Sequence, residues 1–480
     1  MQTDGQDEKM FRAPKMIFWV AFGLRLAAVA IGHTYKIRVD GDHFNFGFEG
    51  GRIARSLVQG QGYANPFNGL SGPTAWLPPL YPLLIALGFK VFGLYTNAAA
   101  FFILACNSLF SALIAPAVYE IAARCFDARG IARRASKHVA PVALWSAWIW
   151  AVYPAFLQYA IHWIWEMSLT TCLFTWALVL ALRLRGEGSG SRAQGSGGAM
   201  TSFGGETKFA GPWALDAGSW LLFGLLWGLI ALSNASLLLV FPATIVWILV
   251  PAKSHDEKHA TGFERGVLGA TVACIVFALT LLPWVLRNER AMHAFIPTRD
   301  NFGVELYQSS LFYHDIYEWG QAVPLDTRNA DYKLYASMGE VAYSHMRGEQ
   351  GKANLRARPG TFLKLTAERV EGFWIGIAHP ADKHPVGEWL RLVNYCSLSA
   401  AGLMGLGLML RRRVPGAWLF AAVFGLVPVA YYVVTVQARF RHPMEPLMAV
   451  LTVYLFRSTS AANPDLQKRE IGGTRLVQHR

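Results

Sequence analysis

About ten long apolar stretches run along the chain, and they constrain its fold more than any other feature of the sequence. A helix that crosses a bilayer needs roughly 20 consecutive apolar residues. The stretches lie at 16–33, 98–122, 139–157, 164–184, 217–233, 235–251, 266–285, 391–410, 416–435 and 441–457. Only 16% of the 480 residues are charged, against about a quarter in soluble domains. We therefore expect an all-α polytopic membrane protein with about ten transmembrane helices.

Basic residues in the short connections predict the orientation of these helices. Lys and Arg cluster at 9–15, 124–137, 183–192, 253–265 and 411–413 and after residue 457. With ten spans all these segments fall on one side, which the positive-inside rule makes cytoplasmic. This pattern accounts for the net charge of +13, so nucleic-acid binding is not expected. The first apolar run lacks a small-residue cleavage site and is expected to remain as an anchor.

Two large polar regions then fall on the outer side, at 34–97 and 286–390. Helical spacing in the second predicts a mostly helical cap, broken at Arg358-Pro359-Gly360. The short apolar run 77–93 is interpreted as an interfacial helix beginning near Pro78, because counting it as a span would invert every later loop. The predicted parts are a membrane module 1–285 with a flexible cytoplasmic Gly/Ser linker at 186–207, the outer region 286–390, membrane helices 391–457 and a cytoplasmic tail 458–480.

Polar side chains at the ends of the apolar stretches collect on this outer side. Charge at a membrane boundary is costly, so such a gathering indicates a site. The candidates are Glu49, His162, Glu166, Asn234, Arg287, Asn288, Arg299, Arg439, Arg441, His442 and Glu445. The five Cys lie in or beside apolar stretches with no paired spacing, which indicates apolar packing rather than disulfides or metal ligands.

Two carboxylates stand out among these candidates. Glu49 begins a segment with apolar residues at i, i+4, which predicts a short helix carrying Glu49 in its first turn. It is either a general base or a helix-start Glu paired with Arg52. Glu166 lies four residues after His162, so both are expected on one helical face at the end of an apolar span. Their neighbours Trp163 and Trp165 are interpreted as interface aromatics.

The remaining candidates have alternatives as well. Asn234 suits a turn or a helix cap. Arg287, Arg299, Arg439, Arg441 and His442 either meet an anion or face solvent and lipid headgroups. Arginine forks bind phosphate oxygens bidentately, so a phosphorylated lipid is the expected anion. Asp42 and His43 are weak candidates for a divalent metal ion, and no cofactor is otherwise indicated.

The chain resembles the GT-C fold membrane glycosyltransferases, in the group of protein mannosyltransferase-like and aminoarabinose transferase-like enzymes. The resemblance lies in I-A-R-S-L-V-Q-G-Q-G-Y, W-L-P-P-L-Y-P-L-L-I-A-L-G-F-K-V-F-G, L-P-W-V-L-R-N with T-R-D-N-F-G-V-E-L, and R-F-R-H-P-M-E-P, in this order. It implies transfer of a sugar from a polyprenyl phosphate on the extracytoplasmic side. The resemblance also implies that an acidic residue of the first outer loop is the catalytic base or orients the acceptor. Relatives carry that residue six or seven positions before I-A-R; here those positions hold Phe46 and Gly47, and Glu49 is nearer. Glu166 matches the second acidic position.

The expected function is thus an inverting glycosyltransferase, a hexosyl- or pentosyltransferase, in the cytoplasmic membrane of a bacterium with its site facing outward. Its expected partners are a polyprenyl-phosphate-linked sugar, a lipid, glycan or protein acceptor, and membrane lipids. A transporter or flippase for a lipid-linked glycan is one alternative, although no internal repeat is evident and Arg25 is the main charge within a span. A surface polysaccharide polymerase or ligase is another.

Overall fold

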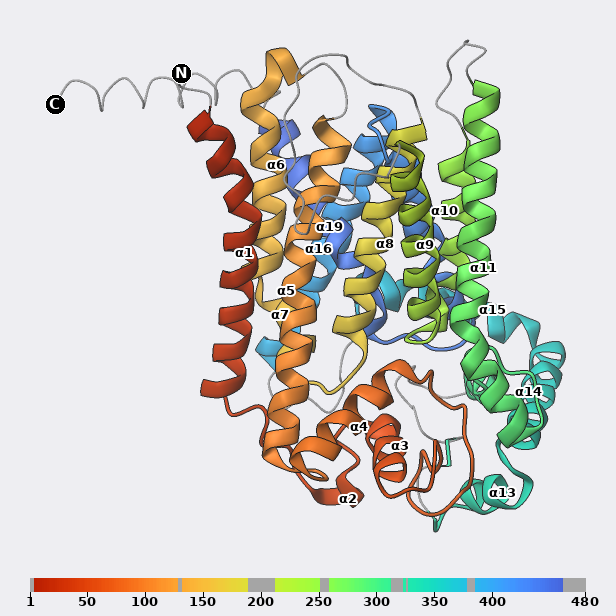
Figure 1. The fold of residues 1–480 in the computed structure, drawn as a ribbon. Helices are drawn as coiled ribbons and strands as arrows, with labels where there is room; N and C mark the ends of the chain where they lie inside the picture. Colours follow the sequence, from red (N-terminus) through yellow and green to blue (C-terminus); the bar gives the residue numbers. More distant parts are fainter. Residues whose placement is uncertain are drawn as a thin grey trace.

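Long, roughly parallel helices form a bundle, and a group of shorter helices gathers at one end of it (Figure 1). The computed structural model describes residues 4–127, 132–188, 212–250, 259–311, 323–324, 327–377 and 385–460. The bundle contains α1 (Asp4–Ile31), α5 (Asn97–Asp127), α6 (Ala132–Val152), α7 (Pro154–Ile161), α8 (Met167–Gly188), α9 (Pro212–Ala231), α10 (Val240–Leu249), α11 (His259–Met292), α16 (Pro385–Arg411), α17 (Ala417–Leu426), α18 (Val429–Val433) and α19 (Glu445–Ser460). Short 3₁₀ helices η1 (Ala235–Leu239) and η2 (Ala438–Met444) precede α10 and α19.

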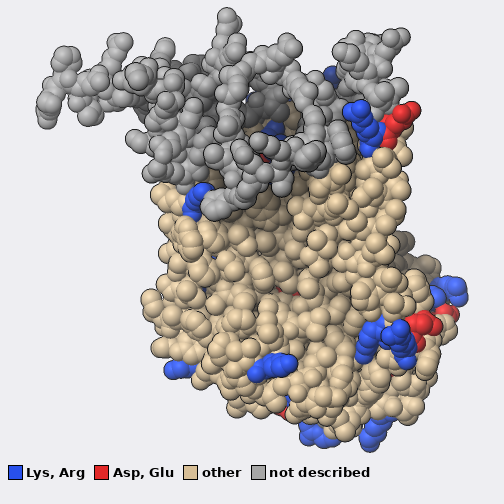
Figure 2. Space-filling model, viewed as in Figure 1, with Lys and Arg blue, Asp and Glu red and all other residues tan. Residues whose placement is uncertain are grey.

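The helices identify an integral membrane protein, as the sequence predicts. Five of them are long and apolar enough to cross a bilayer: Ala13–Ile31, Asn97–Phe126, Met167–Arg185, Phe263–Met292 and Pro385–Arg411. Each of the other predicted stretches also coincides with helix. Among the described residues, the apolar part of each of these helices is shorter than the five spans. On the face that Figure 2 shows, charged side chains gather toward the two ends and leave a wide band nearly free of them. The helical class is confirmed; the count of ten spans stays a prediction.

Arg25 carries the one charge that the sequence places deep in α1, and its side chain is fully buried. Its Nε donates to Ser111 Oγ at 2.9 Å, and its Nη atoms donate to the carbonyl oxygens of Ala21, Trp150 and Ala151 at 2.9–3.0 Å. Buried charge is tolerated when its donors are satisfied in this way. Arg25 therefore joins α1 to α5 and α6.

The end of the bundle that is predicted to face outward is built from both large polar regions, which we name the outer regions after that prediction. The first supplies α2 (Asp40–His43), α3 (Phe48–Val58) and α4 (Leu80–Phe92), and the second supplies α12 (Phe302–Ser310), α13 (Ala330–Met338), α14 (Glu340–Ala357) and α15 (Pro359–Ile375). The predicted helical spacing and the break at Arg358 are confirmed. The run 77–93 forms α4 with Pro79 as its N-cap, as predicted. The linker 186–207 and the tail 458–480 lie almost wholly outside the described residues.

A buried carboxylate fastens the two polar regions together. Glu340, at the start of α14, accepts hydrogen bonds from the Thr74 hydroxyl, from Ala75 N at 2.6 Å and from the Tyr335 hydroxyl at 2.6 Å. Burial raises the pKa of Glu340 to about 7, against the lowering effect of these donors. Arg287, from the end of α11, donates to the carbonyl oxygen of Thr74. The first outer region is thereby held against the second.

Candidate functional site

Glu49 lies in the first turn of α3, as predicted, and its side chain is buried. The helix starts after Gly47, whose φ of 83° is a left-handed conformation that glycine adopts without strain. A Cβ at Gly51 would stand 1.8 Å from the carbonyl oxygen of Phe46. This close approach lets the chain enter α3 at the angle that places Glu49.

Arg52 does not neutralise Glu49 through a direct ion pair. Its Nε lies 3.7 Å from Asp42 Oδ2 and its Nη2 donates to Gly41 O at 3.0 Å, while Arg55 contacts Asp42 at 3.0 Å. The predicted alternative, a Glu49–Arg52 pair, is therefore wrong because Asp42 engages that arginine. The same contacts occupy Asp42, and His43 stacks on Tyr95 with ring centroids 4.3 Å apart.

These contacts leave no support for a metal ion at Asp42 and His43. In the ranges that the structure describes, no three side chains of ligand type are grouped to hold a metal. Asp42 and His43 therefore do not fit a metal site, and no step below uses a metal ion.

Glu166 lies in a turn, not in a helix. The helix α7 ends at Ile161 and α8 begins at Met167, so the prediction that His162 and Glu166 share a helical face is wrong. His162 caps the end of α7 and is exposed. Glu166 instead precedes α8, where its carbonyl oxygen accepts from Thr170 N at 2.8 Å.

The positive charge of Arg439 acts on three carboxylates. Burial raises the pKa of Glu49, of Glu166 and of Glu305, and in each case the nearby positive charge of Arg439 opposes the rise. The guanidinium lies over the Trp165 ring, 4.1 Å from its centroid. Among the described residues no hydrogen bond or ion pair engages it. Electrostatics thus link carboxylates of α3, the α7–α8 turn and α12 to one arginine of η2.

Glu305 is the member that the sequence analysis did not single out. It lies in the first turn of α12, and its Oε1 accepts from Asn301 Nδ2 at 3.3 Å and lies 3.6 Å from Arg299 Nη2. Its Oε2 is buried and has no hydrogen-bond partner among the residues that the structure describes. The signal available in the sequence was its position six residues after Arg299, at the start of an outer helix.

Arg441, His442 and Glu445 form a separate buried cluster. Arg441 donates to Tyr395 O at 2.8 Å, to Ser399 Oγ at 2.6 Å and to Glu445 at 3.3 Å, and Glu445 contacts His442 Nδ1 at 2.6 Å. A 3₁₀ helix has three residues per turn, so Arg439 and Arg441 project to different sides of η2. The two arginines of this segment that were predicted to meet a phosphate therefore have different surroundings. Arg441 packs η2 and α19 against α16.

The other candidates hold the outer loops in place. Arg287 donates to the carbonyl oxygens of Thr74 and Tyr63, and Asn288 donates to Ile296 O at 2.8 Å. Asn234 caps η1 by accepting from Ser236 N at 3.1 Å, which is the alternative its turn position predicted. Of the predicted residues, the structure thus groups Glu49, Glu166, Arg299 and Arg439.

No protein-family model matches the chain, and no curated protein sequence does. Among solved structures, the oligosaccharyltransferase of Archaeoglobus fulgidus, tethered with an acceptor peptide containing the NVT sequon, is 14% identical over 94% of this chain and 50% of its own, with a TM-score of 0.52. The same enzyme in complex with Zn and sulfate is 14% identical over 93% and 49%, with a TM-score of 0.48. The chain spans about half the length of these structures. By its fold, the chain is similar to about half of this oligosaccharyltransferase, an enzyme of the GT-C fold.

Proposed function

We propose that the chain is an integral membrane glycosyltransferase that moves a sugar from a polyprenyl-phosphate donor to an acceptor. The observation that carries the proposal is the electrostatic interaction of Arg439 with Glu49, Glu166 and Glu305, together with its contact on the Trp165 ring. Carboxylates supply bases for an acceptor, and an arginine without a carboxylate bond is free to meet a phosphate. The four groups come from segments far apart in the sequence, which the fold brings to one end of the bundle.

The reaction follows from these groups. Glu49 takes the proton from an acceptor hydroxyl or amine as that oxygen or nitrogen bonds to the anomeric carbon. The bond between this carbon and the phosphate oxygen breaks, and its electron pair leaves on the polyprenyl phosphate. Direct displacement inverts the anomeric centre. The raised pKa of Glu49 makes its carboxylate a stronger base than an exposed one.

Arg439 would hold the charge that develops on the leaving phosphate. A preorganised cation in a site with little water stabilises such charge strongly. Arg299, whose partner Glu305 is 3.6 Å away, is the second cation at this edge. Glu166 and Glu305 would keep Arg439 in place and accept hydrogen bonds from sugar hydroxyls.

The acceptor would approach from the outer helices. A structure of the archaeal oligosaccharyltransferase carries a tethered acceptor peptide; for this chain we propose a lipid, glycan or protein acceptor and a hexosyl or pentosyl donor.

The site would face the periplasm of a bacterial cytoplasmic membrane. A membrane-impermeant maleimide should then label Leu70→Cys in intact spheroplasts, because Leu70 is exposed in the outer region.

Substituting Glu49 by Gln tests the assignment. It removes the base while keeping the size of the side chain, so transfer from polyprenyl-phosphate sugars should fall about 10²–10⁴-fold. Glu289→Gln is the matched control, because Glu289 is an exposed carboxylate at the end of α11. Full activity of Glu49→Gln in a correctly inserted protein would overturn the assignment.

A donor panel separates the alternatives. If the purified protein turns over none of the polyprenyl-phosphate sugars, a transporter or flippase for a lipid-linked glycan is favoured. If only oligosaccharide donors are used, with growth of a polymer, a surface polysaccharide polymerase or ligase is favoured.

A further inference from the structure

Two tryptophan rings stack in the turn that contains Glu166, and a third aromatic ring lies tilted against them. The Trp163 and Trp165 rings are parallel, with centroids 4.6 Å apart and an interplanar angle of 6°. The Phe48 ring lies 4.9 Å from Trp165 and 6.3 Å from Trp163. Arg439 completes the group through its contact with Trp165. We call Phe48, Trp163 and Trp165 the aromatic platform.

Each contributing segment pairs an aromatic ring with a charged group of the candidate site. Phe48 precedes Glu49, Trp165 precedes Glu166, and Phe440 follows Arg439, with its ring 5.2 Å from the guanidinium. The platform therefore contacts Arg439 directly and is one residue away along the chain from both Glu49 and Glu166.

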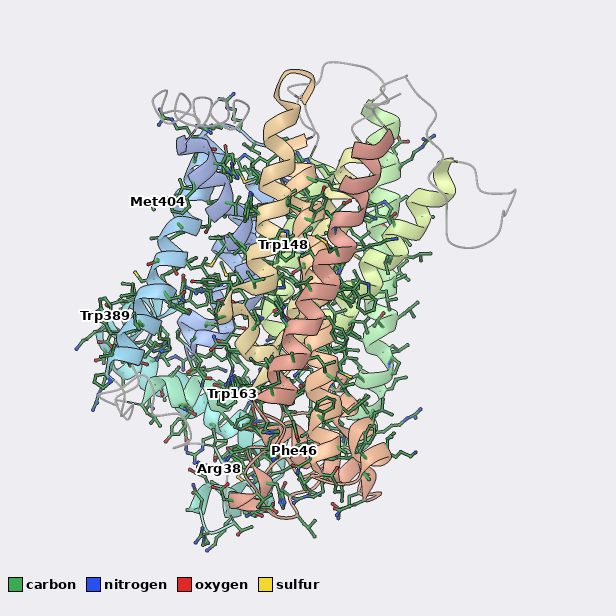
Figure 3. All side chains as sticks on the ribbon, turned by 90° about the vertical axis from the view of Figure 1, so that its left-hand side faces the viewer. Arg38, Phe46, Trp148, Trp163, Trp389 and Met404 are labelled. Carbon is green, nitrogen blue, oxygen red and sulfur yellow. The ribbon has the colours of Figure 1, made fainter. Side chains whose placement is uncertain are left out.

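The platform is accessible. Trp163 is 40% exposed, and Phe48 and Trp165 are partly exposed. Figure 3 places Trp163 where the helix bundle meets the outer segments that contain Phe46. An interface role alone explains one exposed tryptophan, but it does not require a stacked pair held against the arginine of the site.

We propose that the aromatic platform binds the sugar ring of the donor, which deepens the proposed function and rests on it. The face of a sugar ring presents C–H groups of positive character, which suit the negative face of an aromatic ring. The rim of the ring carries hydroxyls, which suit the oxygens of Glu49 and Glu166.

The surroundings favour a sugar over the isoprenoid chain. A hydrocarbon chain on this platform would strip water from Glu49, Glu166 and Arg439 without returning a hydrogen bond, and that is costly. A sugar replaces the water with hydroxyl groups.

Binding to two lipids tests the proposal, with the full-length protein in detergent. The probes are undecaprenyl phosphate and the undecaprenyl-phosphate sugar that the wild type uses best among mannose, glucose, galactose and arabinose forms. Trp163→Ala should weaken binding of the sugar-bearing lipid about 3- to 10-fold, the range for one aromatic contact. Binding of undecaprenyl phosphate should stay within about twofold.

Further variants test whether binding depends on the aromatic face of Trp163 or only on its apolar volume, and a control tests for general effects on folding. Trp163→Phe should retain most of the binding, and Trp163→Leu, which keeps apolar volume without an aromatic face, should lose as much as Trp163→Ala. Trp389→Ala is the control, because Trp389 is an exposed tryptophan on a different part of the molecule (Figure 3) and should change neither lipid's binding.

Two outcomes would overturn the platform and leave the proposed function intact. Equal losses for both lipids would assign the rings to the isoprenoid chain, and unchanged binding in Trp163→Ala and Trp163→Leu would leave them as interface aromatics. If the wild type binds and uses no sugar-bearing lipid, the proposed function fails and the platform with it.

Discussion

Two arginines separated by one residue have opposite surroundings in this protein. Arg439 lies over Trp165 among three carboxylates, and Arg441 is buried with hydrogen bonds to Tyr395, Ser399 and Glu445. The sequence presents them as one basic pair. The structure assigns the first to the candidate site and the second to packing.

Alanine at each position should separate the two roles. Arg441→Ala leaves Glu445 buried with less compensation, so we expect a loss of stability of about 3–5 kcal/mol, measured as a lower melting temperature in detergent. Arg439→Ala should lower glycosyl transfer about 10²–10³-fold, because a cation at the developing charge is lost. Its melting temperature should change little. Equal destabilisation by both substitutions would contradict this division.

At the scale of single elements, α3 owes its position to a backbone contact. Gly51 lets the helix pass the carbonyl oxygen of Phe46, whereas a Cβ at the adjacent Gly50 would meet only the side chains of Ile85, Leu77 and Pro82 at 3.5–3.8 Å. A Cβ is therefore excluded at Gly51 and tolerated at the adjacent Gly50 of the same helix.

Alanine substitutions at these two glycines should differ sharply. In Gly51→Ala the start of α3 must shift, and a displacement of about 1 Å at a catalytic group can lower a rate about 10²-fold. Gly50→Ala should be active and as stable as the wild type or more so, because Ala is favoured over Gly in helices by about 1 kcal/mol. Turnover and melting temperature measure both effects. A normal rate in Gly51→Ala would show that α3 need not be held there.

The contact between the two outer regions should depend on pH. Burial raises the pKa of Glu340 from 4.5 to about 7, and burial together with Glu340 raises the pKa of Asp300 to about 7. A carboxyl with a raised pKa stabilises the folded contact while it is protonated. This contribution is full below about pH 4.5 and is lost as the pH rises through about 7, with a size on the order of 3 kcal/mol for Glu340.

Hydrogen exchange of residues 63–77 at pH 5.5 and pH 8 measures this dependence. We expect faster exchange at pH 8 beyond the intrinsic rate, and a smaller difference in Glu340→Gln. Glu349→Gln is the control on the same helix, because Glu349 is exposed and pairs only with Lys352 among the described residues. Protection that rises toward pH 8 would refute the sign.

At the scale of the whole molecule, the sequence predicted what local patterns determine. Apolar length located the helices, spacing located α3 with Glu49 at its start, and Pro359 located the break between α14 and α15. These features depend on neighbours in the chain. The turn at residues 162–166 was missed because a polar segment between two apolar runs continues a helical pattern as easily as it ends one.

The grouping of the site depended on long-range packing. The charge of Arg439 acts on Glu305 in a fold where the second outer region docks on the first, through contacts such as Glu340 with Thr74, 266 residues apart. No pattern of neighbouring residues in the sequence predicts such a contact. Likewise, the spacing of Arg439 and Arg441 indicates that they face different sides, but only the packing of η2 shows which side is buried.

The burial of Arg25 has a consequence for the synthesis of the protein. The helix α1 is synthesised before α5 and α6, so the Arg25 guanidinium meets Ser111 only 86 residues later and Ala151 only 126 residues later. Protein synthesis adds about 5–20 residues per second, so roughly ten seconds pass before Arg25 can contact its partners. Until then α1 carries an unsatisfied charge that lipid disfavours.

The first helix is therefore expected to stay beside the insertion machinery until α5 and α6 arrive. Ribosome-bound chains halted before Ser111 should lose α1 to alkaline extraction more readily than chains halted after Ala151, and Arg25→Leu should abolish the difference. The order of assembly would then depend on the Arg25 side chain. The hydrogen bonds that join α1 to α5 and α6 would also determine when α1 is released into the bilayer.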